Sequence, residues 1–427
     1  MFEFSEEDII DLEIEIHESV EKYLAENGIQ QCQPEFYKTM ADRITQDYLE
    51  DLICIGFIEE DRSYEKIFKK FRKRVHLFIK NYFSIIGIPR RAYKNPRSTT
   101  YEPVDKHIVK TQIDKLQSAT QFVQRTPEWY QFRHNLITAS NIWKAVGSEA
   151  NQNSLILEKC KPIVTDSYEA TPNTDSPMHW GVKYEPLTTM LYEYRNRCKV
   201  GEFGCIQHPA YSFIGASPDG IVVSEESSAY GRMLEIKNVV SREITGVPKM
   251  DYWVQMQVQM EVCDLNECDF VETQFKEYDE VDEELFYKNK HKYLYNGVIL
   301  YFIKSDFADG KPHYVYMPLN IDLNKSAISE WINEKKREMK DTHVLFKRIY
   351  WYCEAYSCVL VKRNKPWFEM ALPKIQELWN TVEKERITGY EHRKPKKRLV
   401  TDKKCLISKL VREEVRQSEN VLEEELL

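Results

Sequence analysis

The chain has 427 residues, 42% of them hydrophobic, so its length allows two or three domains with buried cores. It contains no run of about 20 uncharged apolar residues, so no membrane-spanning helix is expected. The first residues are acidic and lack the basic and then apolar order of a secretory signal. The ten cysteines form no Cys-x-x-Cys pair, and no nearby histidines complete a zinc site. These features predict reduced thiols and a soluble, intracellular protein that is not secreted.

The net charge of −8 conceals two blocks of opposite sign. Residues 1–61 hold 18 acidic and 3 basic side chains, whereas residues 62–97 hold 12 basic and 1 acidic. An acidic protein can still bind nucleic acid where its basic groups gather. The overall charge therefore neither indicates nor excludes a DNA partner.

Each of these two blocks is predicted to contain an amphipathic helix. The first helix begins at Ser5, where Asp8 completes a capping pattern, and ends near Asn27. The second begins after Ser63 and carries a basic outer surface. The apolar faces are Ile9, Leu12, Ile16, Val20 and Leu24 in the first helix, and Ile67, Phe71, Val75, Phe78 and Ile79 in the second. The basic surface could follow a DNA backbone, but we favour a solvated face that pairs with the acidic first helix.

Changes in composition divide the chain into four parts. Residues 1–97 are predicted to form a helical N-terminal extension, which a proline-containing linker at 88–101 joins to the main domain. Short helices alternate with strand-like runs over residues 112–320, the expected main domain. A helical C-terminal region at 321–390 and a charged, mobile tail at 391–427 follow. The candidate strands are 211–214, 221–223, 233–236, 298–303 and 314–317, the last two flanking an Asp309-Gly310 turn, and the candidate C-terminal helices are 328–339 and 374–384.

Two carboxylates and a lysine are predicted to converge on neighbouring strands. Asp219, in a Ser-Pro-Asp-Gly run, precedes one candidate strand, and Glu235 and Lys237 lie on one face of the next. Carboxylates hold hard cations such as Mg²⁺, and a lysine beside them can position or help deprotonate a water nucleophile. Taken alone, the pattern also fits a turn aspartate followed by a surface strand.

Three further segments contain polar residues that suit a phosphodiester substrate. Arg133 precedes Thr138 and Ser140, either of which could cap a helix whose backbone N–H groups face an anion. Glu185 stands at an expected helix start, with Pro186 in the first turn. Glutamines alternate with apolar residues at 252–260, as expected for a half-buried helix. Each segment alone equally fits an ordinary capped or packed helix.

Together these segments follow the order and spacing of a known family. They are Trp129…Arg133…Ile137-Thr138-Ala139-Ser140, Trp180-Gly181…Tyr184-Glu185, Ser217-Pro218-Asp219-Gly220, Leu234-Glu235-Ile236-Lys237 and Tyr252…Gln255…Gln257. Over residues 120–265 the chain resembles the phage-lambda-type exonucleases, or YqaJ-like viral recombinase family, of the PD-(D/E)XK nuclease superfamily. Its long extensions are similar to those of members from large DNA viruses.

The resemblance implies a catalytic metal site. Asp219 and Glu235 would hold Mg²⁺ together with the backbone carbonyl of Ile236, and Mn²⁺ could substitute. Lys237 would act on the attacking water. Asn238 and the valine after it replace the small residue and proline of many relatives, so the local loop is expected to differ while the ligands are kept.

The resemblance also implies roles around the metal. Glu185 would support the site or a second metal, with Gln255 as a polar helper. Arg133 and Ser140 would bind the terminal 5′-phosphate of the substrate. Supporting roles are expected for Thr138 and Gln257.

The fold expected is α/β, a PD-(D/E)XK core with a mixed central sheet flanked by helices and with helical extensions at both ends. The activity expected is Mg²⁺-dependent digestion of linear double-stranded DNA, 5′ to 3′ from a phosphorylated end, in viral recombination, repair or replication processing. DNA ends, a single-strand annealing protein and a homotrimer are the implied partners, in the host cytoplasm or a viral factory. Two alternatives stay open: an endonuclease using the same site, and a non-catalytic DNA-binding or scaffold protein.

Overall fold

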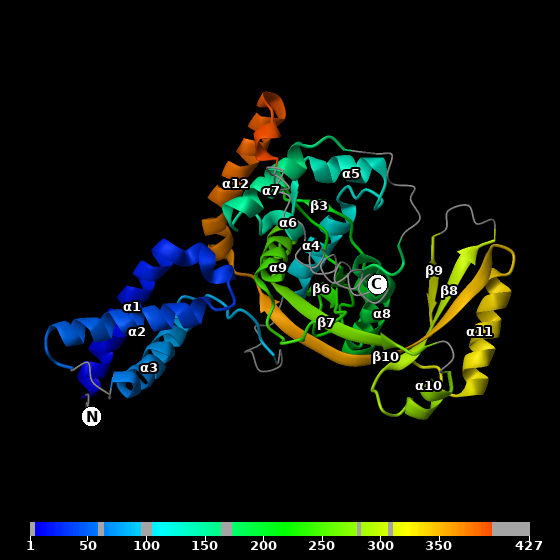
Figure 1. The fold of residues 1–427 in the computed structure, drawn as a ribbon, viewed down its shortest axis with the longest axis horizontal. Coiled ribbons are helices and arrows are strands. Elements are labelled where there is room, and N and C mark those ends of the chain that lie inside the picture. The colour runs from blue at the N-terminus through cyan, green and yellow to red at the C-terminus, as the bar shows by residue number, and fades with distance from the viewer. Residues whose placement is uncertain are drawn as a thin grey trace, which may run out of the picture.

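The computed structural model describes residues 5–58, 64–94, 105–163, 173–279, 283–305 and 311–394. Figure 1 shows three parts along the longest axis: an N-terminal helical unit, a central α/β body and a lobe in which β8 and β9 lie beside α11. The described part of the chain has no helix long and apolar enough to cross a membrane. The predictions for Asp309-Gly310, for Ser63 and for most of the 391–427 tail concern residues outside the described ranges.

The N-terminal unit contains α1 (Glu6–Asn27), η1 (Gly28–Cys32), α2 (Phe36–Cys54) and α3 (Tyr64–Ile85). The two predicted helices are confirmed as α1 and α3, and Ser5 caps α1 in a capping box with Asp8. The sequence analysis missed α2, whose start no side chain caps.

The three helices of this unit share a hydrophobic core built from all of them. Polar contacts also join α3 to the others: Asn81 donates to Glu13 at 3.0 Å and Tyr82 to Glu21 at 3.2 Å. The basic helix therefore does pack against the acidic first helix. An interhelical ion pair joins Arg72 of this helix to Asp42 of α2.

Seven strands of the described residues form the central sheet, in the order β2-β5-β6-β7-β10-β8-β9. They are β2 (Val200–Gly201), β5 (Gly220–Val222), β6 (Met233–Asn238), β7 (Glu267–Glu277), β8 (Asn296–Lys304), β9 (His313–Tyr316) and β10 (His343–Lys362). Because β6 and β7 are parallel and the other pairs antiparallel, the sheet is mixed, which confirms the predicted α/β class. A smaller sheet joins β1 (Ile137–Thr138), β4 (Ile214–Ala216) and β3 (Ile206–Gln207).

Four of the five candidate strands are confirmed, as β5, β6, β8 and β9, and the last two form the predicted antiparallel hairpin. The strand predicted at 211–214 is wrong except for Ile214. The residues before it form a turn, because the ring nitrogen Nδ1 of His208 accepts hydrogen bonds from the backbone N–H groups of Ala210 and Tyr211.

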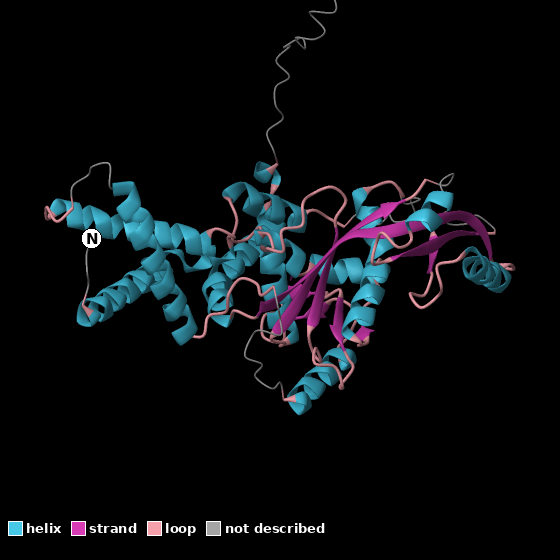
Figure 2. Ribbon diagram, turned by 90° about the horizontal axis from the view of Figure 1, so that it is seen from below, coloured by secondary structure: helices cyan, strands magenta, loops and turns pink. Residues whose placement is uncertain are grey.

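The predicted helical region at 321–390 is correct for α11 (Lys325–Met339) and α12 (Lys365–Thr388) but wrong between them. There β10 runs for 20 residues and pairs with β7 on one side and β8 on the other. Figure 2 shows these strands running through the body into the lobe. The C-terminal region therefore completes the central sheet and is not a purely helical addition.

Helices cover both faces of the sheet where β6 and β7 meet. The helix α8 (Pro177–Asn196) packs on Leu234 and Val271 through Tyr192. On the opposite face, α9 (Met250–Cys263) packs on Met233 and Phe270. The remaining helices are α4 (Lys106–Ser118), α5 (Pro127–His134), α6 (Ala139–Ile142), α7 (Glu149–Cys160), α10 (Glu283–Asn289) and η4 (Glu391–Arg393).

Candidate active site

The antiparallel pair β5–β6 brings the predicted acids together. Gly220 pairs with Leu234, so Asp219, one residue before β5, lies beside the β6 backbone. Its carboxylate Oδ2 accepts the backbone N–H of Ile236 at 2.7 Å, and its own N–H donates to the Leu234 carbonyl at 3.2 Å. These two bonds hold the Asp219 carboxylate against the strand that carries Glu235 and Lys237.

Glu235 is fully buried, and both of its carboxylate oxygens are engaged. Lys237 forms an ion pair with Oε1. Oε2 accepts hydrogen bonds from Gln255 at 2.9 Å and Gln259 at 2.8 Å. A buried carboxylate with three charged or polar donors keeps its negative charge at one fixed position.

Gln259, which was not predicted, contacts Glu235, whereas the predicted supporting residue Gln257 contacts other groups. Residues 255 and 259 are one helical turn apart and share a face of α9, whereas Gln257 points elsewhere. Gln257 donates to the Lys362 carbonyl at 3.0 Å and accepts the Asn364 N–H at 2.7 Å. The i,i+4 spacing from Gln255 was the signal that identifies Gln259.

A cavity of about 520 Å³ opens beside these residues. Asp219, Ile236 and Lys237 line it together with Glu185 of α8, and Tyr252 forms part of its wall. The Lys237 ammonium also lies 5.0 Å from the centre of the Tyr252 ring. The mouth has an apolar rim, formed by Met178, Val182 and Val240, which are 84%, 40% and 44% exposed.

Glu185 reaches this cavity from the interior of a helix and not from its first turn. The helix α8 begins at Pro177 and is capped by Ser176, whose side chain accepts the His179 N–H. Glu185 and Pro186 therefore lie two turns further along, which corrects the predicted helix start. The position still directs the Glu185 side chain to the same cavity as Asp219.

The site holds more negative than positive charge. Burial, followed by the charges of Glu235 and Glu185, raises the pKa of Asp219 well above its ordinary value. Burial and the charge of Glu235 also raise the pKa of Glu185. Burial alone would lower the pKa of Lys237, but Glu235 and Asp219 together raise it. Lys237 and Arg242 are the basic residues in the cavity lining, and Arg242 is paired with Glu272, so an additional cation would relieve the repulsion among the three carboxylates.

The donor set fits a hard divalent cation. Asp219 and Glu235 offer carboxylate oxygens from adjacent strands, and Ile236 lines the same cavity. Across the described ranges, no three His, Cys, Asp or Glu side chains converge closely enough to hold a metal together. Such a pair of carboxylates matches Mg²⁺, which keeps several waters and takes phosphate oxygens as further ligands.

The predicted phosphate-binding residues belong to a second cavity, of about 350 Å³, which shares no lining residue with the first. Arg133 and Thr138 line it, and the guanidinium of Arg133 lies 4.4 Å from the centre of the Trp129 ring. Thr138 precedes α6, a helix of four residues that its side chain does not cap. Ser140 is exposed, does not line the cavity and shares a 3.1 Å hydrogen bond with Thr138.

Lys159 is a basic residue of this second cavity that the sequence analysis missed. It is only 6% exposed, and its ammonium donates to the Arg133 carbonyl at 2.9 Å. Burial, with the nearby charges of Arg133 and Arg386, lowers its pKa to about 8 despite Glu158. A lysine at a buried position of α7, next to Leu155 and Ile156, was the available signal. The cavity therefore has a surplus of positive charge that an anion would neutralise.

The fold is a mixed α/β core with Asp219 directly before one strand and Glu235 and Lys237 on the next. Residues 128–266 match the YqaJ-like viral recombinase domain, the family that the motifs of this segment predicted. The match covers the strands and helices that carry every proposed site residue.

A relative from Acanthamoeba polyphaga mimivirus, "Uncharacterized protein R354", is 30% identical over 308 residues, 64% of this chain and 54% of the relative. The chain thus spans about half the length of the curated relative it matches.

Among solved structures, the alkaline exonuclease LHK-Exo from Laribacter hongkongensis is 19% identical, with a TM-score of 0.35, and covers 61% of this chain and 94% of its own. A phage-related exonuclease from Haemophilus somnus is 13% identical, with a TM-score of 0.31. The match covers 58% of this chain and 94% of that exonuclease. Both TM-scores are low, so neither structure assigns the fold. The assignment rests on the strand order of the sheet described above.

Proposed function

We propose that this protein is a Mg²⁺-dependent deoxyribonuclease that digests linear double-stranded DNA 5′ to 3′ from a phosphorylated end. The observation that carries the proposal is the convergence of Asp219 and Lys237 at one cavity, with Glu235 buried beside it and paired with Lys237. The match of residues 128–266 to the YqaJ-like viral recombinase domain supports DNA as the substrate.

In this mechanism, Asp219 and Glu235 would hold the cation, and Mn²⁺ would substitute for Mg²⁺. When bound, the cation would lower the pKa of a coordinated water and offset charge on the scissile phosphate. Lys237, held between Glu235 and the Tyr252 ring, orients the attacking water. Gln255 and Gln259 fix the Glu235 carboxylate, so its geometry requires no reorganisation during the reaction.

Recognition of a phosphorylated end is assigned to the second cavity. Arg133 can bind a phosphate through two parallel N–H groups, and the buried ammonium of Lys159 adds a second positive charge. Thr138 and Ser140 contribute hydroxyl groups at the edge of this cavity. Thr138 pairs in register with Gly215, four residues before Asp219, which links the two cavities through β4.

The biological setting proposed is processing of viral DNA for recombination, repair or replication, with a single-strand annealing protein as partner and a homotrimer as the assembly. The 3′ single strand left by 5′ digestion is the substrate that an annealing protein requires.

The test compares three substrates in Mg²⁺: linear duplex with 5′-phosphate ends, the same duplex with 5′-hydroxyl ends, and a closed circle. The wild type should digest the phosphorylated duplex fastest and leave the circle intact. Arg133→Ala should lose the preference for phosphate, whereas Arg337→Ala, an exposed arginine of α11, should keep it. Cutting of the circle would instead support the endonuclease alternative.

A further inference from the structure

The lobe made by β8, β9, β10 and α11 lies outside residues 128–266 and next to α8 (Figure 1). One face of its sheet packs on α11 and α10 through a hydrophobic core. The opposite face is covered at its inner end by α8, which contributes Tyr184 and Leu187 to a second core. The outer end of this second face extends beyond that core.

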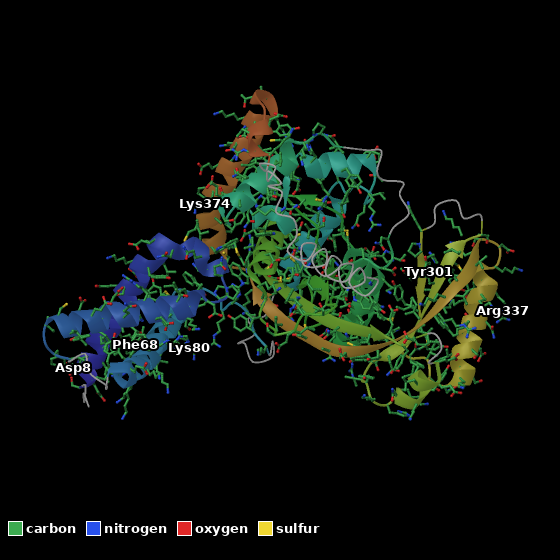
Figure 3. The ribbon with its side chains drawn as sticks, in the orientation of Figure 1. Asp8, Phe68, Lys80, Tyr301, Arg337 and Lys374 are labelled. Carbon is green, nitrogen blue, oxygen red and sulfur yellow. The ribbon has the colours of Figure 1, made fainter. Side chains whose placement is uncertain are left out.

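Aromatic rings follow one another from the edge of this second core, against which Tyr314 and Tyr301 pack, to the outer end of the face. Phe346 is 64% exposed, and its ring centre lies 5.0 Å from that of Tyr301. Tyr301 is 5.2 Å from Tyr314, and Tyr314 is 5.8 Å from His179 of α8, with a 2.7 Å hydrogen bond between its hydroxyl and the ring nitrogen. We call His179, Tyr314, Tyr301 and Phe346 the aromatic track. Figure 3 labels Tyr301 on this lobe.

Phe346 owes its exposure to an irregularity in β10. The pairing of β10 with β8 shifts between Leu345 and Lys347, so Phe346 has no partner in the register. A bulge of this kind changes the direction of a side chain and is common beside functional sites. Here the bulge exposes the large ring of Phe346 to solvent, so the ring contributes little hydrophobic stabilisation to the fold.

The aromatic track ends where the acid cavity begins. His179 belongs to the first turn of α8, and its neighbours Pro177 and Met178 line the cavity of Asp219. A DNA strand that passes around the N-terminal end of α8 would therefore leave the cavity and meet the track.

The chemistry of the surface fits unpaired bases. The exposed ring of Phe346 and the half-buried rings of Tyr301 and Tyr314 provide stacking platforms for bases of any sequence, whereas bases inside a duplex already stack on one another. Lys347 pairs in register with Tyr301 on the same face and adds positive charge for the backbone. Val344, which is 50% exposed, extends the apolar surface.

We propose that the aromatic track binds single-stranded DNA at the mouth of the active site, by stacking of its bases on Phe346, Tyr301 and Tyr314. This inference rests on the proposed nuclease function and assigns a place to the strand that is not digested. A second copy of this chain covering the same face is the competing occupant.

The test measures binding of a fluorescent oligothymidylate to the full chain in the Glu235→Gln background, which removes cleavage from the readout. Phe346→Ala should weaken binding by about 5- to 100-fold, as expected for the loss of one stacked base. Phe346→Trp should restore it. Ile387→Ala, an 88% exposed apolar residue of α12, is the matched control and should bind like the parent. A sugar-phosphate oligonucleotide of the same length but without bases should bind Phe346→Ala and the parent with equal affinity.

Equal oligothymidylate affinity for Phe346→Ala and the parent would overturn the proposal. A parent dimer that becomes monomeric in Phe346→Ala, with unchanged DNA affinity, would overturn it in favour of an interface between copies. These binding results can be told apart from an error in the proposed nuclease function. If that function were wrong, the wild-type protein would degrade no DNA.

Discussion

At the scale of single residues, Glu235 is the most constrained group of the candidate site. It is fully buried and charged, and a lysine and two glutamines supply its partners. Removal of one partner from a buried charge costs far more than removal of an exposed one, because nothing replaces the lost hydrogen bond. The partners of Glu235 should therefore affect the reaction as well as stability.

Gln259→Leu should lower the rate of DNA digestion by about 10- to 100-fold, since hydrogen bonds to charged groups contribute about 1.5–3 kcal/mol. Gln257→Leu is the matched control two residues away on the same helix, because Gln257 contacts the Lys362 carbonyl and not Glu235. It should reduce the free energy of unfolding but leave the rate per folded molecule unchanged. Equal rates for both variants, measured after correction for the folded fraction, would refute the assigned role of Gln259.

Lys159 should make stability depend on pH. Its pKa is about 8 in the folded chain, against 10.5 ordinarily, because of burial and the charges of Arg133 and Arg386. The unfolded chain binds more protons between these two values, so the free energy of unfolding rises with pH across this range. Relative to Lys159→Met, the wild type should gain about 2 kcal/mol between pH 8 and pH 10.

Urea unfolding of the wild type and Lys159→Met at these two pH values measures the gain. Lys161→Met, at an exposed lysine of the same cavity, is the control and should follow the wild type. An identical pH dependence in the wild type and Lys159→Met would show that the ammonium is not desolvated.

At the scale of elements, the N-terminal helices have a hydrophobic core of their own. Ile16 of α1 is fully buried in it, whereas Ile14 of the same helix is 52% exposed. Ile16→Ala should reduce the free energy of unfolding of this unit by about 2–5 kcal/mol, from lost burial and a new cavity. Ile14→Ala should change it by no more than about 0.5 kcal/mol.

Hydrogen exchange resolves this effect by element. Ile16→Ala should accelerate exchange in α1, α2 and α3 and leave β6 and β7 protected. Equal acceleration in β6 would mean that the N-terminal unit and the sheet unfold together, contrary to the separation of their cores.

Elements with strong local signals were predictable from the sequence. A capping box marks α1, and short apolar runs bounded by turn residues mark β5 and β6. By contrast, β10 is a strand because it pairs with β7 and β8, which are distant in sequence, and no local pattern records those partners. The helix α2 has no capping side chain at its start, so its boundary carried no signal.

The candidate site was also predictable only where local sequence determines the geometry. Asp219, Glu235 and Lys237 converge because adjacent antiparallel strands have a fixed register. The separation of Arg133 from this cavity depends on how α5 and α7 pack, which residue types alone do not determine. The choice between Gln257 and Gln259 required the direction in which α9 faces the sheet.

At the scale of the whole molecule, the N-terminal unit is joined to the body by a buried arginine. Arg91 donates to the carbonyls of Pro248 at 2.8 Å, Cys32 at 2.7 Å and Gln31 at 3.2 Å. Pro248 lies just before α9, which carries Gln255 and Gln259. The extension therefore buttresses the start of the helix that supports Glu235, while the lobe of β8 and β9 borders α8 on the other side (Figure 1).

The central claim, a metal-dependent nuclease centre at Asp219 and Glu235, is tested most directly by one assay. Linear duplex DNA is incubated with wild-type protein, Glu235→Gln or Glu354→Gln, each with Mg²⁺ or with a chelator. Glu354 is a partly exposed acid of β10 outside the cavity and serves as the control. The wild type and the control should digest the DNA only in Mg²⁺, and Glu235→Gln should lose at least about 100-fold of this activity. Equal digestion by Glu235→Gln and the wild type, or digestion that persists in the chelator, would contradict the central claim.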